Sequence, residues 1–368
     1  MKGYTIAVLP GDGIGPEVIA AAERVLLAVG ERGGIRFALE HFPIGAAAVA
    51  AAGDPFPTET RAAVTRADAV LLGAVGDPAL DGVPPPRPLR PETGLLALRA
   101  HLGVYANVRP IALHPELADC SPLKPDRLRG VDFVIVRELT GGLYYGEPRG
   151  RGRDGFSAVN TLTYSATEIE RVARVACEIG RRRRRLVTSV DKANVLEVSQ
   201  LWRETVTRVG AEYPDVRVEH MYVDTAALRL VAEPGAFDVL LTENMFGDIL
   251  SDEAAVLPGS LGLLPSASLG TGPGLFEPVH GSAPDIAGQD VANPIGAISS
   301  AAMLLRYGLG LPEPAATVEQ AITLALEQGA RTRDIARPSD RVIGTREMGT
   351  WIAELVRTPA RRPLSVVR

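Results

Sequence analysis

The sequence predicts an α/β protein built around a largely parallel sheet. Three observations support this. The 368 residues suffice for two domains at ~150 residues each. Short apolar runs alternate with helical patterns along most of the chain. Hydrophobic residues make up 46% and charged residues 23%, which is ordinary for a globular protein.

The N-terminal part of the chain predicts the first strands and the first helix. Residues 5–9 form a short apolar run typical of a strand, and residues 10–15 form a turn. A helical pattern follows over 16–29, because proline is favoured at the start of a helix. Residues 36–40 and 67–73 predict two further strands, the second ending in a glycine turn.

The middle and C-terminal parts of the chain continue the alternation. The apolar runs predict strands over residues 131–136, 185–190, 216–222 and 237–241. The helical periodicity predicts helices over residues 166–183, 194–210, 247–256 and 318–328.

Three segments show little periodicity: residues 76–91, 141–155 and 258–294. The first contains the stiff run Pro84-Pro85-Pro86. Long segments without regular structure inside a compact protein are usually binding loops. We therefore expect ligand contacts in these segments.

Charge and composition exclude several classes of protein. A net charge of −5 argues against general nucleic-acid binding. The run Arg181 to Arg185 fits a solvated helix end, and the alternative is a site for an anion or RNA. Two cysteines exclude a disulfide scaffold. Because no run of ~20 apolar residues occurs and the N-terminal run is too short for a signal peptide, we expect a cytoplasmic protein without a membrane partner.

Two acids suggest a metal site. Asp248 and Asp252 are four residues apart, which places both carboxylates on one face of a helix. A divalent cation would offset their repulsion, and an all-oxygen ligand set indicates Mg²⁺ or Mn²⁺. The alternative is two solvated acids on an exposed face.

Arginines and a tyrosine suggest an anionic substrate. Arg137 directly follows a buried strand, and Arg99 and Arg109 lie in neighbouring segments. Arginine binds carboxylates through paired hydrogen bonds, so several arginines favour a substrate with more than one carboxylate. Each could instead be a surface cation. Tyr144, flanked by glycines, could donate a proton, or could pack against Tyr145.

Lysine is rare in this chain. Of 39 Lys and Arg residues only Lys2, Lys124 and Lys192 are lysines. Lysine can lose its proton near neutral pH when buried, whereas arginine cannot. Lys192 follows a predicted strand, where open α/β sheets place functional groups. It is therefore a candidate base.

The glycines of Gly11-Asp12-Gly13-Ile14-Gly15 do not make a dinucleotide motif. The Rossmann motif needs G-x-G-x-x-G, and here the third glycine comes one residue early. We interpret this segment as a turn before a helix and reject a Rossmann fold.

Several long motifs together resemble the β-decarboxylating dehydrogenases, the family of isocitrate and isopropylmalate dehydrogenases. They include RPETGLLALR, VRELTGGLYYGEPRG, SVDKANVL and FEPVHGSAPDIAG. The resemblance covers nearly the whole chain and implies a two-domain, non-Rossmann α/β fold. Residues 1–104 with 258–368 would bind the nucleotide. Residues 105–257 would carry the dimer interface and the metal and substrate site, with an arm around 141–165.

The resemblance also implies a role for individual residues. Lys192 matches the residue that deprotonates the substrate hydroxyl, and Tyr144 matches the one that returns a proton. The implied metal ligands are Asp248 and Asp252, with Asp224 as a third ligand from the other subunit. Lys192 also comes from the other subunit. The implied substrate-binding residues are Glu92, Leu95, Leu96, Arg99, Arg109 and Arg137. The implied cofactor-binding residues are Glu277, His280, Gly281, Ser282, Ala283, Asp285 and Asn293.

The implied activity is NAD- and Mg²⁺- or Mn²⁺-dependent oxidative decarboxylation of 3-isopropylmalate to 4-methyl-2-oxopentanoate, a step of leucine biosynthesis, by a homodimer with shared active sites. Asp285 matches the acid that accepts the ribose hydroxyls, which favours NAD over NADP. Leu95 and Leu96 argue against isocitrate and homoisocitrate. The alternatives are another 3-substituted malate, D-malate or tartrate, or a non-catalytic regulatory subunit. Residues 76–80 and Pro84-Pro85-Pro86 depart from the family pattern, which affects the expected fine specificity.

Overall fold

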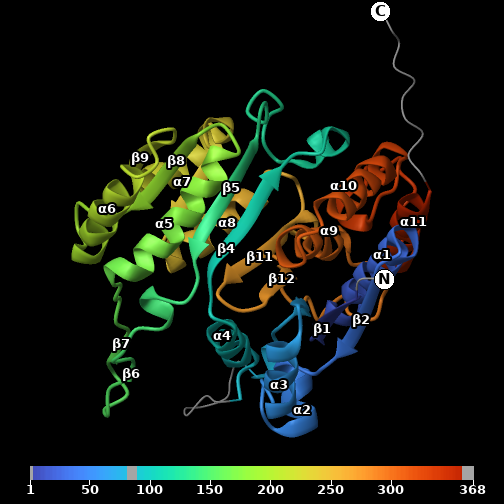
Figure 1. Ribbon diagram of the computed structural model, residues 1–368, viewed down its shortest axis with the longest axis horizontal. Helices are drawn as coiled ribbons and strands as arrows, with labels where there is room; N and C mark the ends of the chain where they lie inside the picture. The colour runs from blue at the N-terminus through green and yellow to red at the C-terminus, as the bar shows by residue number, and fades with distance from the viewer. Residues whose placement is uncertain (1–2, 81–88, 359–368) are drawn as a thin grey trace, which may run out of the picture. The chain divides into compact units, whose positions relative to one another are not determined.

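A computed structural model describes residues 3–80 and 89–358 (Figure 1). The mixed α/β architecture that the sequence predicts is confirmed. The chain forms two compact units, residues 1–95 with 276–368 and residues 96–275. These junctions are not the predicted ones at 104/105 and 257/258, and the roles assigned to the two domains stay predictions. Pro84-Pro85-Pro86 falls outside the described residues.

The first unit contains parallel strands. Strand β1 (Gly3–Gly11) pairs on one side with β2 (Arg36–His41) and on the other with β3 (Ala69–Ala74). Every residue of β3 is buried, which explains its continuous apolar sequence. Strand β12 (Gly274–Pro278) is also buried and carries the chain from the second unit into the first.

Helices pack around these strands. Helix α1 (Gly15–Gly33) has proline in its first turn and buries one apolar face. It packs along α11 (Thr345–Arg357), where a Cβ on Gly349 would lie only 2.6 Å from that of Ala21. Glycine therefore allows the two helices to approach closely. The other helices are α2 (Gly45–Ala52), α3 (Thr58–Arg66), α9 (Ile295–Met303) and α10 (Pro312–Glu327).

The second unit has a mixed sheet with strand order β11-β4-β5-β10-β8-β9. Strand β4 (Val104–Ala112) is antiparallel to both β11 (Pro265–Gly270) and β5 (Asp132–Glu138). From β5 onward the neighbours are parallel: β10 (Val239–Thr242), β8 (Leu186–Asp191) and β9 (Arg217–Tyr222).

The connecting helices of this unit are α5 (Ala166–Arg181), α6 (Glu197–Gly210), α7 (Val223–Ala232) and α8 (Asn244–Ala255). Because the four parallel strands end at one edge of the sheet, their carboxyl ends bring the following residues together there. A two-residue ladder of β6 (Gly150–Arg151) and β7 (Ala158–Val159) forms the arm, with Phe156 at 96% exposure. Among the described residues no helix is long and apolar enough to cross a membrane.

The structure corrects the sequence prediction for one segment and adds elements that the sequence did not reveal. Residues 258–294 were expected to lack regular structure, but they contain β11 and β12. Small residues dominate β11, so it shows no apolar alternation. Strand β4 escaped prediction because Pro110 interrupts its apolar run, and α4 (Pro91–Leu102) is a further helix that the periodicity did not reveal.

Candidate active site

Arg137 lies at the centre of a polar cluster in the second unit. It occupies the end of β5 and is only 2% exposed. Its Nη1 donates a hydrogen bond to Asp248 Oδ1, while Nε and Nη2 both donate to Asn244 Oδ1, at 3.1 and 2.7 Å. Asn244 in turn donates to the carbonyls of Leu139 and Gly141, at 3.1 and 3.0 Å. The guanidinium is therefore held in one orientation beside an aspartate.

Arg109, on β4, lies near Asp248 and Asp252. Its Nε donates to Asn107 Oδ1 at 2.7 Å and its Nη1 to Ser251 Oγ at 2.6 Å. Its guanidinium lies 4.0 Å from Asp248 and 3.5 Å from Asp252. Asp248 is thus partnered rather than solvated, whereas the side chain of Asp252 is 68% exposed. Two cations beside two aspartates make a site for several charged oxygen groups.

The pKa of Asp248 is lowered. Burial acts to raise it, but the charge of Arg137, the Tyr144 hydroxyl and the charge of Arg109 outweigh burial. Burial raises the pKa of Asp252, with Arg109 opposing this. Asp248 is therefore an anion at neutral pH, which is the form that binds a cation.

Tyr144 and Tyr145 point to different partners. The Tyr144 hydroxyl donates to Asp248 Oδ2 at 2.7 Å. Burial, and then the hydrogen bond to Asp248, raise the pKa of Tyr144 to about 12, so it keeps its proton at neutral pH. Tyr145 instead donates to the carbonyl of Leu96 at 3.3 Å. Tyr144 is thus the tyrosine placed at the acidic and basic cluster.

A second cluster forms at the ends of β8 and β9. Asp191 and Tyr222 are opposite each other in the ladder, and Lys192 and Asp224 follow them. Lys192 Nζ lies 2.8 Å from Asp224 Oδ1. The hydrogen bond from Lys192 lowers the pKa of Asp224. These two residues are exactly those that the family resemblance assigns to the neighbouring subunit's site.

The three aspartates do not gather into one metal site within a single chain. No group of three or more His, Cys, Asp or Glu residues in the described part of the chain could hold a metal ion. The carboxylates themselves suit Mg²⁺ or Mn²⁺, which prefer oxygen ligands. Asp248 and Asp252 would supply two carboxylate ligands. If Asp224 is the third ligand, it must come from another copy of the chain.

The predicted substrate-pocket residues share one face of α4. Glu92, Leu95, Leu96 and Arg99 follow the spacing i, i+3, i+4 and i+7 of one helix face. Arg99 is buried at 9% exposure, the two leucines are half-buried, and Glu92 is exposed. The helix therefore presents a cation and an apolar pair side by side.

The predicted cofactor residues lie in the first unit. Glu277 is the penultimate residue of β12, and Ser282 packs against the turn after β1, where its carbonyl accepts from Ile14 N at 2.8 Å. A Cβ on Gly13 would lie 1.9 Å from that carbonyl, so this glycine allows close packing beneath the loop. Just before α9, Asn293 Oδ1 accepts from Ile295 N at 3.0 Å, and its Nδ2 donates to Asp334 Oδ2 at 3.0 Å.

The rest of this loop is open to a ligand. The residues Gly281 and Asp285 are exposed. His280 contacts the Gly281 carbonyl through Nδ1 at 2.9 Å, and burial lowers the pKa of His280. A neutral imidazole and an exposed carboxylate thus flank the same short loop.

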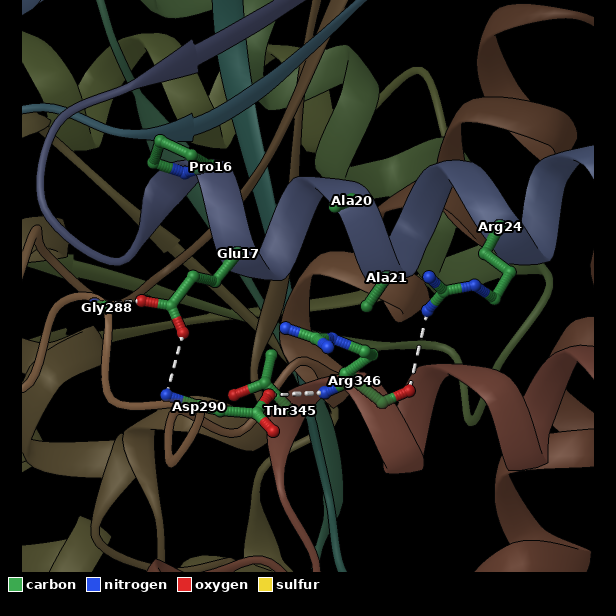
Figure 2. A pocket seen from close by; sticks show the side chains of 9 residues that line it. All are labelled: Pro16, Glu17, Ala20, Ala21, Arg24, Gly288, Asp290, Thr345 and Arg346. Atoms are coloured by element: carbon green, nitrogen blue, oxygen red, sulfur yellow. Dashed lines mark hydrogen bonds between the residues drawn. The ribbon is translucent and has the colours of Figure 1, made fainter.

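Figure 2 shows how this loop is tied to α1. Glu17 accepts hydrogen bonds from the backbone of Gly288 and of Asp290, the latter at 3.2 Å, and Asp290 accepts from Arg346 N at 2.9 Å. These residues line a pocket of about 350 Å³ that contains none of the predicted site residues. Sequence reasoning missed Glu17, as it missed Asn107, Asn244 and Ser251, because each acts by orienting another residue.

Comparisons with known proteins place the chain in a family. The family model described as isocitrate/isopropylmalate dehydrogenase matches residues 5–352. A 3-isopropylmalate dehydrogenase of Geobacillus kaustophilus is 57% identical, over 95% of this chain and 94% of its own. One from Gloeobacter violaceus is 56% identical, over 94% and 96%.

Solved structures agree. An isocitrate dehydrogenase from Methylococcus capsulatus has a TM-score of 0.85 at 36% identity, over 96% of this chain and 100% of its own. A β-decarboxylating dehydrogenase from Thermococcus kodakarensis has a TM-score of 0.77 at 40% identity, over 96% of each chain. Fold and motifs thus define a β-decarboxylating dehydrogenase. The chain belongs to the isocitrate/isopropylmalate dehydrogenase family, as its motifs predicted.

Proposed function

We propose that this enzyme catalyses NAD-dependent oxidative decarboxylation of 3-isopropylmalate to 4-methyl-2-oxopentanoate, as in leucine biosynthesis. The observation that carries the proposal is the cluster in which Arg109, Arg137 and Tyr144 all contact Asp248. It joins carboxylate binding, cation binding and a proton donor in one place. The names of the relatives at 56–57% identity support the same substrate.

The side chains of this chain then have distinct tasks. Arg99, Arg109 and Arg137 hold the carboxylates of the malate. Asp248 and Asp252, with Asp224 of the other subunit, would hold a divalent cation, which would supply Lewis-acid stabilisation of negative charge on the substrate oxygen, and bound NAD would supply the hydride acceptor. Lys192 accepts the proton of the C2 hydroxyl. After CO₂ leaves from C3, Tyr144 returns a proton to that carbon.

This arrangement implies a homodimer with shared active sites. Lys192 and Asp224 form one set of residues, and the remaining site residues of the second unit form another. The described part of one chain holds no complete metal site. Large apolar side chains are exposed in the loop before α6, on α7, on and directly after α8, and at the β6–β7 ladder, where a second copy could cover them. They are Val195, Leu228, Val231, Ile249, Val256 and Phe156.

The exposed carboxylate of Asp285 favours NAD, because it would repel the 2′-phosphate of NADP. A cytoplasmic location stays a prediction from the sequence.

The test is NADH formation by purified protein with Mn²⁺ or Mg²⁺. The substrates would be 3-isopropylmalate, 3-methylmalate, 3-benzylmalate, D-malate, tartrate and isocitrate, each with NAD and with NADP. We expect the highest kcat/KM with 3-isopropylmalate and NAD, and loss of activity in EDTA that Mn²⁺ reverses.

A preference for a bulkier malate would keep the chemistry and change the substrate, since an apolar pocket separates alkyl groups by only ~1–3 kcal/mol per methylene. If folded, dimeric protein reduced neither NAD nor NADP with any of these substrates, the result would contradict the proposal and favour a regulatory subunit.

A further inference from the structure

The Lys192–Asp224 pair depends on two neighbouring strand ends keeping their positions. Lys192 directly follows Asp191, the last residue of β8, and Asp224 lies two residues beyond Tyr222, the last residue of β9. A shift of either strand end would change the 2.8 Å separation between Lys192 Nζ and Asp224 Oδ1. The ladder pairs Asp191 with Tyr222, and side-chain contacts to these two residues can fix the strand ends further.

Arg203 of α6 contacts both strand ends. Its Nε donates to Asp191 Oδ2 at 2.8 Å and its Nη2 to Asp191 Oδ1 at 2.9 Å, a two-bond pair with a carboxylate that is only 1% exposed. The guanidinium carbon also lies 5.1 Å from the centre of the Tyr222 ring. Asp191 Oδ1 accepts from Ala193 N at 3.0 Å as well, so a hydrogen bond joins the residues directly before and after Lys192.

The helix that carries Arg203 is itself anchored to β8. Trp202 is 1% exposed, and its Nε1 donates to Ser189 Oγ at 3.1 Å. His220 of β9 lies 3.9 Å from Asp191 but is engaged with Thr207 at 2.9 Å. Of the two basic side chains near the buried Asp191 carboxylate, Arg203 is therefore the one that makes close hydrogen bonds to it.

We propose that Arg203 is a positioning residue that holds Lys192 and Asp224 in the geometry their chemistry needs. The proposal rests on the roles given to those two residues under the proposed function. Lysine could not replace Arg203, because a single ammonium does not bridge both oxygens of a carboxylate while lying flat on a ring. A purely structural ion pair would affect stability and nothing else.

The experiment compares the full-length dimer with Arg203→Met, Arg203→Lys and the double variant Arg203→Met/Asp191→Asn. Arg203→Met alone leaves a buried carboxylate without its partner and can fail to fold. The double variant removes that charge while the Asn oxygen still accepts from Ala193 N. Arg208→Met is the matched control, because Arg208 lies on the same helix in an exposed pair with Glu170.

Two readouts separate positioning from folding. The first is kcat against KM for the malate, and the second is the Mn²⁺ dissociation constant, measured by electron paramagnetic resonance without turnover. We expect the double variant to melt near the wild type, yet to lose ~10–100-fold in kcat and in Mn²⁺ affinity, with KM nearly unchanged. Arg203→Lys should recover only part of the loss, and Arg208→Met should match the wild type.

A folded double variant with wild-type kcat and wild-type Mn²⁺ affinity would overturn the proposal. An inactive wild type would contradict the proposed function instead. In that case the Mn²⁺ affinities alone decide the role of Arg203.

Discussion

Lys192 bears the same charge as the 36 arginines of this chain but differs from them in being able to release a proton. Lys192→Arg should keep the ion pair with Asp224, because the charge is unchanged. It should lower kcat by ~10²–10⁴-fold, the usual contribution of a general base. Steady-state kinetics with the dimer confirmed by light scattering would check this. A kcat within threefold of the wild type would exclude Lys192 as the base.

Tyr144 offers a paired comparison with its neighbour. Tyr144→Phe removes the hydroxyl that donates to Asp248 and should lower kcat by ~10²-fold or more with little change in folding. Tyr145→Phe loses only a 3.3 Å bond to a carbonyl and should stay within a few-fold of the wild type. Equal kinetic losses in the two variants would contradict a specific role for Tyr144.

At the scale of elements, helix α5 provides a test of stability without chemistry. Ser165 Oγ accepts from Glu168 N at 3.3 Å, and the Glu168 carboxylate accepts from Ser165 N at 2.8 Å, which makes a complete capping box. Ser165→Ala should lower the free energy of unfolding by about 1 kcal/mol. Thermal melting would show this as a lower Tm, while kcat should not change.

Some elements of the fold could be predicted from the sequence and others could not. Strands such as β3 were predictable because burial on both faces makes their sequences continuously apolar. Strand β11 was not, since its small residues carry no pattern. The residue types of the site were predictable from the motifs, but the contact of Arg137 with Asp248 joins positions 111 residues apart, and only the sheet brings them together. The role of Asn244 could not be predicted for the same reason, since its contact with Arg137 also joins positions far apart in the sequence.

At the scale of the whole molecule, three half-buried histidines predict how stability depends on pH. Burial lowers the pKa of His114, His220 and His280; at His220 Arg203 adds to this and Asp191 opposes it, and at His280 the Gly281 carbonyl and Asp334 oppose it. The unfolded chain therefore binds protons near pH ~6.5 that the folded chain does not, so stability falls as pH drops through that value. We therefore expect these histidines to lower the free energy of unfolding between about pH 7.5 and about pH 6.

Melting temperatures of the ligand-free protein at constant concentration would measure this dependence. His114→Gln should flatten it, and the exposed His101→Gln should not. A Tm that rises on acidification over this range would contradict the prediction.

The division of the site between two copies of the chain can be tested with two inactive proteins. Lys192→Ala removes a residue of one set, and Asp248→Asn removes a residue of the other. If the sets belong to different subunits, a mixed dimer has one damaged site with both changes and one site with neither. Unfolding and refolding an equal mixture should make about half the dimers mixed, each with one of two sites intact.

The mixture should therefore recover about a quarter of the wild-type activity, although each variant refolded alone stays inactive. Refolded wild type gives the reference yield. If both sets served the same subunit's site, every site in the mixture would carry one damaged residue and no activity would return. This outcome would overturn the shared site while leaving the proposed reaction intact, so the two conclusions can fail separately.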